Sequence, residues 1–140
     1  MTRKDLVQKV LQRKKDINIT LENISKLSGV ANRTVNRFFA GKDVKLSTVE
    51  KITNLLGLDF SGNEIVTVKE LRDNRAKKNA LYIVGLVQDT SALEEQGLEN
   101  TELNILISET KEQFLNGFYK KKLWSGDYSS PINLDLKFTT

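Results

Sequence analysis

Apolar residues recur at helical spacing through the first 58 residues of the chain. Side chains three and four positions apart share one face of an α-helix, so this pattern predicts four or five short amphipathic helices. The clearest of them are expected at about 2–15, 20–28, 31–39 and 47–56. Threonines that can cap a helix begin the first two, and Ser47 with Glu50 predicts a capping box for the last.

A glycine separates the second and third of these helices. Gly29 can adopt a positive φ without a Cβ clash, which ends a helix sharply, and Val30 is expected to plug the core at the turn. Val35 and Phe38 supply the apolar side of the third helix. Two short helices joined by such a turn predict a helix-turn-helix motif.

The second half of the chain is predicted to form longer helices. Residues 59–66 are interpreted as a linker, because Gly, Ser and Asn cluster there. Thr67 and Glu70 predict a capping box for a helix that runs from about 68 into the nineties. Its segment LYIVGLV is typical of either a buried strand or a buried helix, and the helix-forming residues around it favour the helix. A further helix is expected over 101–116.

The end of the chain has a different pattern. After Pro131, apolar and polar residues alternate in the sequence INLDLKF, a period of two that predicts a short β-strand. The predicted fold class is therefore all-α, with a possible exception only in the tail. The expected organisation is a helix-turn-helix domain at 1–58, a linker at 59–66, a helical module at 67–124 and a tail at 125–140.

Composition excludes several classes of protein. The 140 residues include neither cysteine nor histidine, which rules out disulfides, cysteine-liganded zinc and catalysis by either residue. The sequence has no Walker loop, dinucleotide-binding fingerprint or Gly-x-Ser-x-Gly elbow, so we expect no enzyme and no cofactor. It also has no apolar run of membrane-spanning length and no signal-peptide pattern, so we expect a cytoplasmic protein with no membrane partner.

Charge is divided unevenly along the chain. Residues 1–60 contain 12 basic and 6 acidic residues, a net charge of +6, whereas residues 61–140 contain 10 and 12, a net charge of −2. A basic domain joined to a slightly acidic one indicates a polyanion as partner of the first part only. A solubilising surface explains the same numbers, so charge alone leaves both interpretations open.

The third predicted helix carries polar residues that suit DNA. Asn32, Arg33 and Asn36 are expected on its outer surface near its N-terminus, the end that enters the major groove in helix-turn-helix proteins. An Asn amide can pair with an adenine edge, and an Arg can donate two hydrogen bonds to guanine. Thr34 and Arg37 flank them and suit phosphate oxygens.

The sequence SGVANRTVNRFFAGK, with one helix before it and a capped helix after it, resembles the XRE family, the helix-turn-helix domains of lambda repressor and Cro type. The resemblance covers residues 1–58 and implies a bundle of about five helices that binds operator DNA as a symmetric dimer. It assigns base reading to Asn32, Arg33 and Asn36, and DNA-backbone contacts to Thr34, Arg37, Lys42 and Lys45. The chain departs from the usual family pattern at Leu21, Ala31 and Ala40.

These features predict a sequence-specific transcriptional regulator, most simply a homodimeric repressor that binds a palindromic double-stranded DNA operator. The helical module at 67–124 then serves dimerisation, because a reader of palindromic DNA must space its two recognition helices about one helical turn apart. The alternative is an antitoxin, in which this module masks a protein toxin and the first domain represses its own operon. The alternating tail suits strand addition to such a partner.

Overall fold

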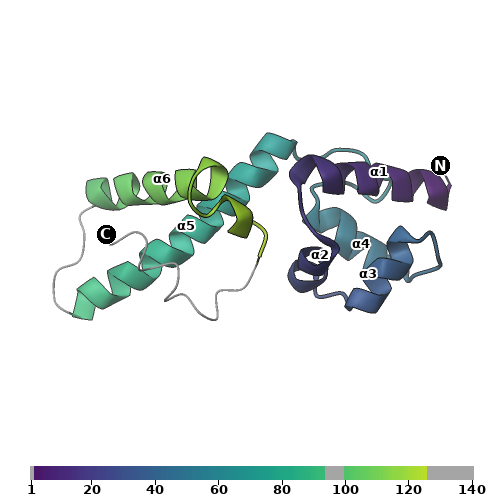
Figure 1. Ribbon diagram of the computed structural model, residues 1–140, viewed down its shortest axis with the longest axis horizontal. Helices are drawn as coiled ribbons and strands as arrows, with labels where there is room; N and C mark the ends of the chain where they lie inside the picture. The colour runs from purple at the N-terminus through teal and green to yellow at the C-terminus, as the bar shows by residue number, and fades with distance from the viewer. Residues whose placement is uncertain (1, 94–99, 126–140) are drawn as a thin grey trace. The chain divides into compact units, whose positions relative to one another are not determined.

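The computed structural model describes residues 2–93 and 100–125, and Figure 1 shows their arrangement. Six α-helices and one short 3₁₀ helix account for its regular structure: α1 (Arg3–Ile17), α2 (Leu21–Ser28), α3 (Asn32–Phe39), α4 (Leu46–Leu55), α5 (Val68–Leu93), α6 (Asn100–Asn116) and η1 (Lys120–Lys122). No strand occurs in the described residues, which confirms the all-α class. The strand predicted after Pro131 lies outside them.

The chain divides into two compact units, Met1–Leu71 and Arg72–Thr140. The first unit contains four complete helices, α1 to α4, and the first turn of α5. Residues 59–66, interpreted from the sequence as a linker, lie within this first unit rather than between the two.

Threonine side chains begin the first two helices as expected. Thr2 forms a capping box with Asp5: the Asp5 amide donates to Thr2 Oγ1 at 3.2 Å, and the Thr2 amide donates to Asp5 Oδ2 at 3.0 Å. The hydrogen bond from the Thr2 backbone amide to the Asp5 carboxylate, and after it one from the Thr2 side chain, holds the pKa of Asp5 below its usual value. Thr20 caps α2 by accepting a hydrogen bond from the Asn23 amide at 3.1 Å.

The capping box predicted for the fourth helix is wrong. The amides of Thr48 and Val49 both donate to the carbonyl of Lys45, at 3.0 and 3.2 Å, so α4 already begins at Leu46. Ser47 therefore lies inside the first turn, and Lys45 occupies the N-cap position without a side-chain cap. At the start of α5 only half of the expected capping box forms. The Glu70 amide donates to Thr67 Oγ1 at 3.1 Å, but the Glu70 carboxylate accepts a hydrogen bond from the Thr67 hydroxyl, also at 3.1 Å, and not from the Thr67 backbone amide.

The core of the first unit draws apolar side chains from all four helices. Val10, Ile24, Val35, Ile52 and Leu56 are fully buried. Burying an aliphatic side chain of this size contributes about 1.5–3 kcal/mol, so this core is the main source of the unit's stability.

A loop after α4 folds back onto α1. The Arg13 guanidinium donates to the carbonyls of Gly57 (3.3 Å) and Val66, and only 5% of the Arg13 side chain is exposed. Within the loop, Asp59 Oδ1 accepts hydrogen bonds from the amides of Ser61 (2.8 Å) and Asn63 (2.9 Å). Buried contacts with α1 thus make this segment a structural part of the first unit.

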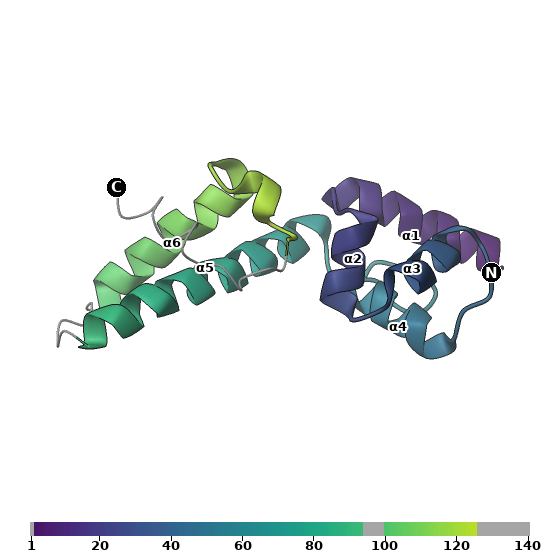
Figure 2. The ribbon, with the colours of Figure 1, turned by 60° about the horizontal axis from the view of Figure 1, so that its bottom comes forward.

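The second unit is a helical hairpin, in which α6 returns beside α5 in both views of the ribbon (Figures 1 and 2). Arg75 Nε and Asn79 Nδ2 each donate to the Leu123 carbonyl at 3.0 Å, which ties α5 to the segment after α6. The LYIVGLV segment belongs to α5, so the helical interpretation is right and the strand alternative is wrong. Among the described helices, none has the length and apolar character needed to cross a membrane.

Candidate nucleic-acid interface

The α2–α3 turn is built on Gly29, which adopts φ +75° as the sequence predicted. The Gly29 amide donates to the Ser25 carbonyl at 3.0 Å and closes α2. Ser25 then donates its hydroxyl to the Val30 carbonyl, and the Val30 amide donates to Ser28 Oγ at 3.2 Å. Val30 is buried at this turn. Its burial and its hydrogen bonds with Ser25 and Ser28 together fix the direction in which the chain enters α3.

Helix α3 is sharply divided into two faces. Val35 and Phe38 are buried, and Phe38 packs edge-on against the ring of Phe39, with the ring centroids 5.1 Å apart. The opposite face is exposed and carries Asn32, Arg33, Asn36 and Arg37. These positions follow an i, i+1, i+4, i+5 spacing, so all four lie on one side of the helix. The three residues expected to read bases are among them.

The N-terminus of α3 carries no side-chain cap. Ala31 occupies the N-cap position and its methyl group cannot accept a hydrogen bond. The amides of Asn32 and Arg33 consequently have no hydrogen-bond partner in the part of the chain that the structure describes. Helix N-termini carry partial positive charge and attract anions. No acidic residue lies in the first turn of α3 to offset it.

A shallow depression of about 300 Å³ lies beside this face, between the first turns of α3 and α4. It brings together three of the four residues expected to contact phosphates, namely Thr34, Arg37 and Lys45. The fourth, Lys42, is exposed on the loop after α3 but does not line the depression. Asp43 is its one acidic lining residue.

Sequence reasoning missed two residues of this depression, Thr48 and Lys51 on α4. Thr48 is only 8% exposed, and its hydroxyl has no hydrogen-bond partner among the described residues. Lys45, Thr48 and Lys51 follow one another at intervals of three, which places them along one side of α4. That spacing was the available signal, although it did not reveal that this side of α4 lies next to α3.

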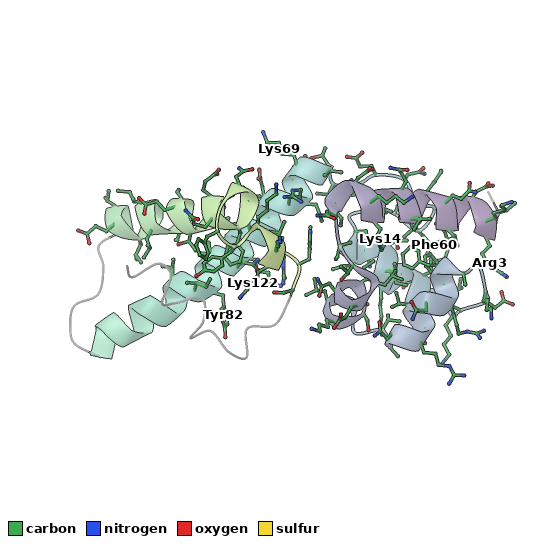
Figure 3. All side chains as sticks on the ribbon, in the orientation of Figure 1. Arg3, Lys14, Phe60, Lys69, Tyr82 and Lys122 are labelled. Carbon is green, nitrogen blue, oxygen red and sulfur yellow. The ribbon has the colours of Figure 1, made fainter. Side chains whose placement is uncertain are left out.

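Arginines hold the loop between α3 and α4 in place. Arg37 donates to the backbone carbonyl of Asp43 at 3.3 Å. Arg3, at the beginning of α1 (Figure 3), forms an ion pair with the Asp43 carboxylate and donates to the Gly41 carbonyl at 3.3 Å. Since Arg3 neutralises Asp43, the edge of the depression remains positive overall.

The described residues contain no group of three acidic side chains that could hold a metal ion. Comparison of the chain with protein-family models, with curated proteins and with solved structures gives no match.

Proposed function

We propose that this chain is a sequence-specific DNA-binding protein, most simply a transcriptional repressor, in which α2 and α3 form a helix-turn-helix and α3 enters the major groove. The observation that carries the proposal is the exposed face of α3, which presents two amides and two guanidiniums and no carboxylate. An ordinary surface helix would mix acidic and basic residues there.

The residue types on this face suit direct reading of bases. Asn32 and Asn36 lie one turn apart on α3, so each amide can donate to and accept from a separate adenine edge. Arg33 lies beside them and can donate to both acceptors of a guanine. All three side chains are exposed and none has a hydrogen-bond partner among the described residues, so no internal bond has to break before DNA binds.

The depression beside α3 suits a backbone phosphate. Arg37, Lys45 and Lys51 supply positive charge, and Thr34 and Thr48 supply hydroxyl donors. Contacts of this kind fix the position of a protein on the duplex without reading its sequence. On this proposal the depression sets the register and the neighbouring face of α3 selects the bases.

The first unit on this proposal is a lambda repressor-like domain, as the resemblance of residues 1–58 implies. The first turn of α5 adds a fifth helical segment to α1–α4 within it. A repressor of this type binds a palindromic operator as a homodimer, with one recognition helix in each half-site.

A pair of substitutions tests the proposal against the DNA upstream of the chain's own gene. Arg33→Ala should reduce the preference for the specific site over unrelated DNA by about 1–3 kcal/mol, because one base contact is lost. Arg37→Ala should weaken binding to all sequences similarly and reduce the salt dependence by about one charge. Gel-shift titrations at several salt concentrations measure both effects.

Lys15→Ala is the matched control, because it removes one exposed positive charge from the last turn of α1, outside the proposed recognition helix. It should leave the sequence preference unchanged. If Arg33→Ala keeps the preference of the wild-type protein while circular dichroism shows intact helices, α3 is not the recognition helix.

A further inference from the structure

Charge is divided unevenly within the second unit as well. Residues 72–78 and 118–125 together contain seven basic residues and one acidic residue, whereas residues 100–116, which form α6, contain one basic and three acidic residues. The small net charge of the second half of the chain conceals this separation, because opposite charges cancel in the sum. The second unit therefore has a strongly basic part, which the expectation of a polyanion partner for the first part alone did not take into account.

Two elements of the fold bring these basic residues together. Arg75 Nε and Asn79 Nδ2 of α5 both donate to the Leu123 carbonyl at 3.0 Å, so the segment that carries η1 is fastened to the first half of α5. In both ribbon views η1 lies beside this part of α5 (Figures 1 and 2). Leu123 and Trp124 are buried, so the attachment belongs to the core of the unit.

Three consecutive lysines form η1, and all of them are exposed. Lys122 extends over the ring of Tyr119, with its Nζ 5.9 Å from the ring centroid. Lys120 and Lys121 form no ion pair with any residue that the structure describes. At least these two positive charges are thus available to an anion outside the unit.

Helix α5 extends the same basic region. Arg72, Arg75 and Lys78 recur at intervals of three, which places them along the side of α5 to which η1 is attached. Lys78 is exposed and forms no ion pair with a described residue. Asp73, the one acidic residue of this stretch, follows Arg72 directly and so lies on another side of the helix. We call the three α5 cations and residues 120–122 the basic surface.

We infer that the basic surface of the second unit binds the phosphate backbone of duplex DNA without reading its sequence. Lysine ammonium groups bind phosphates as point charges, and such contacts strengthen binding to all sequences alike. The partner is DNA because the proposed function already brings DNA to this chain, and residue 72 follows directly on the first unit. The inference rests on the proposed function for its partner and goes beyond it, since it gives the second unit a DNA contact of its own.

The variant K120Q/K121Q of the full-length chain tests the basic surface on a duplex of unrelated sequence. It removes two exposed charges and leaves Lys122 in place on Tyr119. Loss of two phosphate contacts should weaken binding about tenfold at low salt and reduce the slope of log affinity against log salt by about two. K78Q makes the same test on α5 and should reduce the slope by about one. Fluorescence anisotropy titrations at several salt concentrations measure both quantities.

The matched control K15Q/K77Q also removes two exposed lysine charges. Lys15 lies in the last turn of α1, and Lys77 lies on the side of α5 away from Arg72 and Arg75. The control should keep the affinity and the salt dependence of the wild-type protein. An equal loss in both double variants would show that only net charge matters and would overturn the inference, as would a wild-type slope in K120Q/K121Q.

Two further outcomes separate this inference from its neighbours. If K120Q/K121Q loses binding to phosphatidylserine vesicles but keeps its DNA affinity, the surface serves a membrane and the inference fails. K120Q/K121Q should also keep the preference for the specific site that Arg33→Ala loses. A preference lost in Arg33→Ala with an unchanged slope in K120Q/K121Q rejects the inference alone, whereas a reduced slope in a chain without any sequence preference rejects the proposed function instead.

Discussion

Thr48 contributes both to packing and to the proposed phosphate contact. It is almost entirely buried, and its hydroxyl has no hydrogen-bond partner among the described residues. The hydroxyl oxygen is not among the buried polar atoms that lack a partner, so it reaches solvent at the edge of the positive depression, where a phosphate oxygen can accept its hydrogen bond.

Replacement of Thr48 by Val separates these two effects. Val keeps the branched shape and removes a hydroxyl that bonds to no described residue. The midpoint temperature of thermal unfolding should therefore stay constant or rise. Affinity for DNA should fall by about 1 kcal/mol, roughly fivefold, for specific and unrelated sequences alike. Calorimetry and gel-shift titration measure the two quantities. A lower midpoint with unchanged DNA affinity would assign Thr48 to packing alone.

Arg13 shows at the same scale what a sequence conceals. It lies among Gln12, Lys14 and Lys15, and such a charged run suggests a solvated helix surface. The side chain is nevertheless buried, because the carbonyls of Gly57 and Val66 accept its hydrogen bonds. Those acceptors lie more than forty residues away in the sequence, so no local pattern predicts the burial.

Among the elements, the α2–α3 turn depends on one glycine. Gly29 has φ +75°, and an added methyl group would meet no atom within 4 Å. Gly29→Ala should therefore destabilise the first unit by conformational strain alone, by about 1–2 kcal/mol. Gly85, inside α5, also has open space around an added methyl group, so Gly85→Ala should stabilise its helix by about 1 kcal/mol at most.

Denaturant titrations of the two glycine variants give the comparison. The two substitutions should change the free energy of unfolding in opposite directions. The added methyl group strains the left-handed backbone at Gly29, whereas it favours the helical backbone at Gly85. Equal stabilities for Gly29→Ala and the wild-type protein would show that the turn relaxes to another conformation.

The loop after α4 should respond to acid through Asp59. The Asn63 amide first, and then the Ser61 amide, donates a hydrogen bond to this carboxylate and lowers its pKa in the folded protein. In the unfolded chain the carboxyl has its ordinary pKa. The stabilisation is therefore fully present above that ordinary value, and it is lost as the pH falls through the lower pKa of the folded protein.

An NMR titration checks this expectation. The amide signals of Ser61 and Asn63 should shift together with an inflection below the ordinary pKa of an aspartate. In Asp59→Asn the acceptor oxygen remains but cannot titrate, so this inflection should disappear. An inflection at or above the ordinary value in the wild-type protein would contradict the hydrogen-bonded loop.

On the scale of the whole molecule, two units divide the work on our proposals. The first carries the excess positive charge of the chain, a net charge of +6 over residues 1–60 against −2 over residues 61–140, and the second is the module expected to join two copies. Association and DNA binding should therefore be coupled only on DNA that offers two half-sites.

Local sequence determined much of this protein. Thr2, Thr20 and Gly29 fix helix ends through bonds and dihedral angles that involve only nearby residues, and all three act as predicted. The division of α3 into a buried and an exposed face also follows from its periodicity, because faces of a helix depend only on spacing. The capping box at Ser47 was misplaced because several adjacent polar residues could begin α4, and hydrogen bonds to the Lys45 carbonyl decide between them.

Only the tertiary structure decided which distant residues meet. It placed Thr48 and Lys51 beside Thr34 and Arg37, and it turned residues 59–66 from an expected linker into a loop packed on α1. The physical reason is that such contacts depend on how the apolar faces pack against one another, whereas periodicity describes each helix by itself. The sequence alone thus supplied the residues suited to DNA, and packing supplied the depression between them.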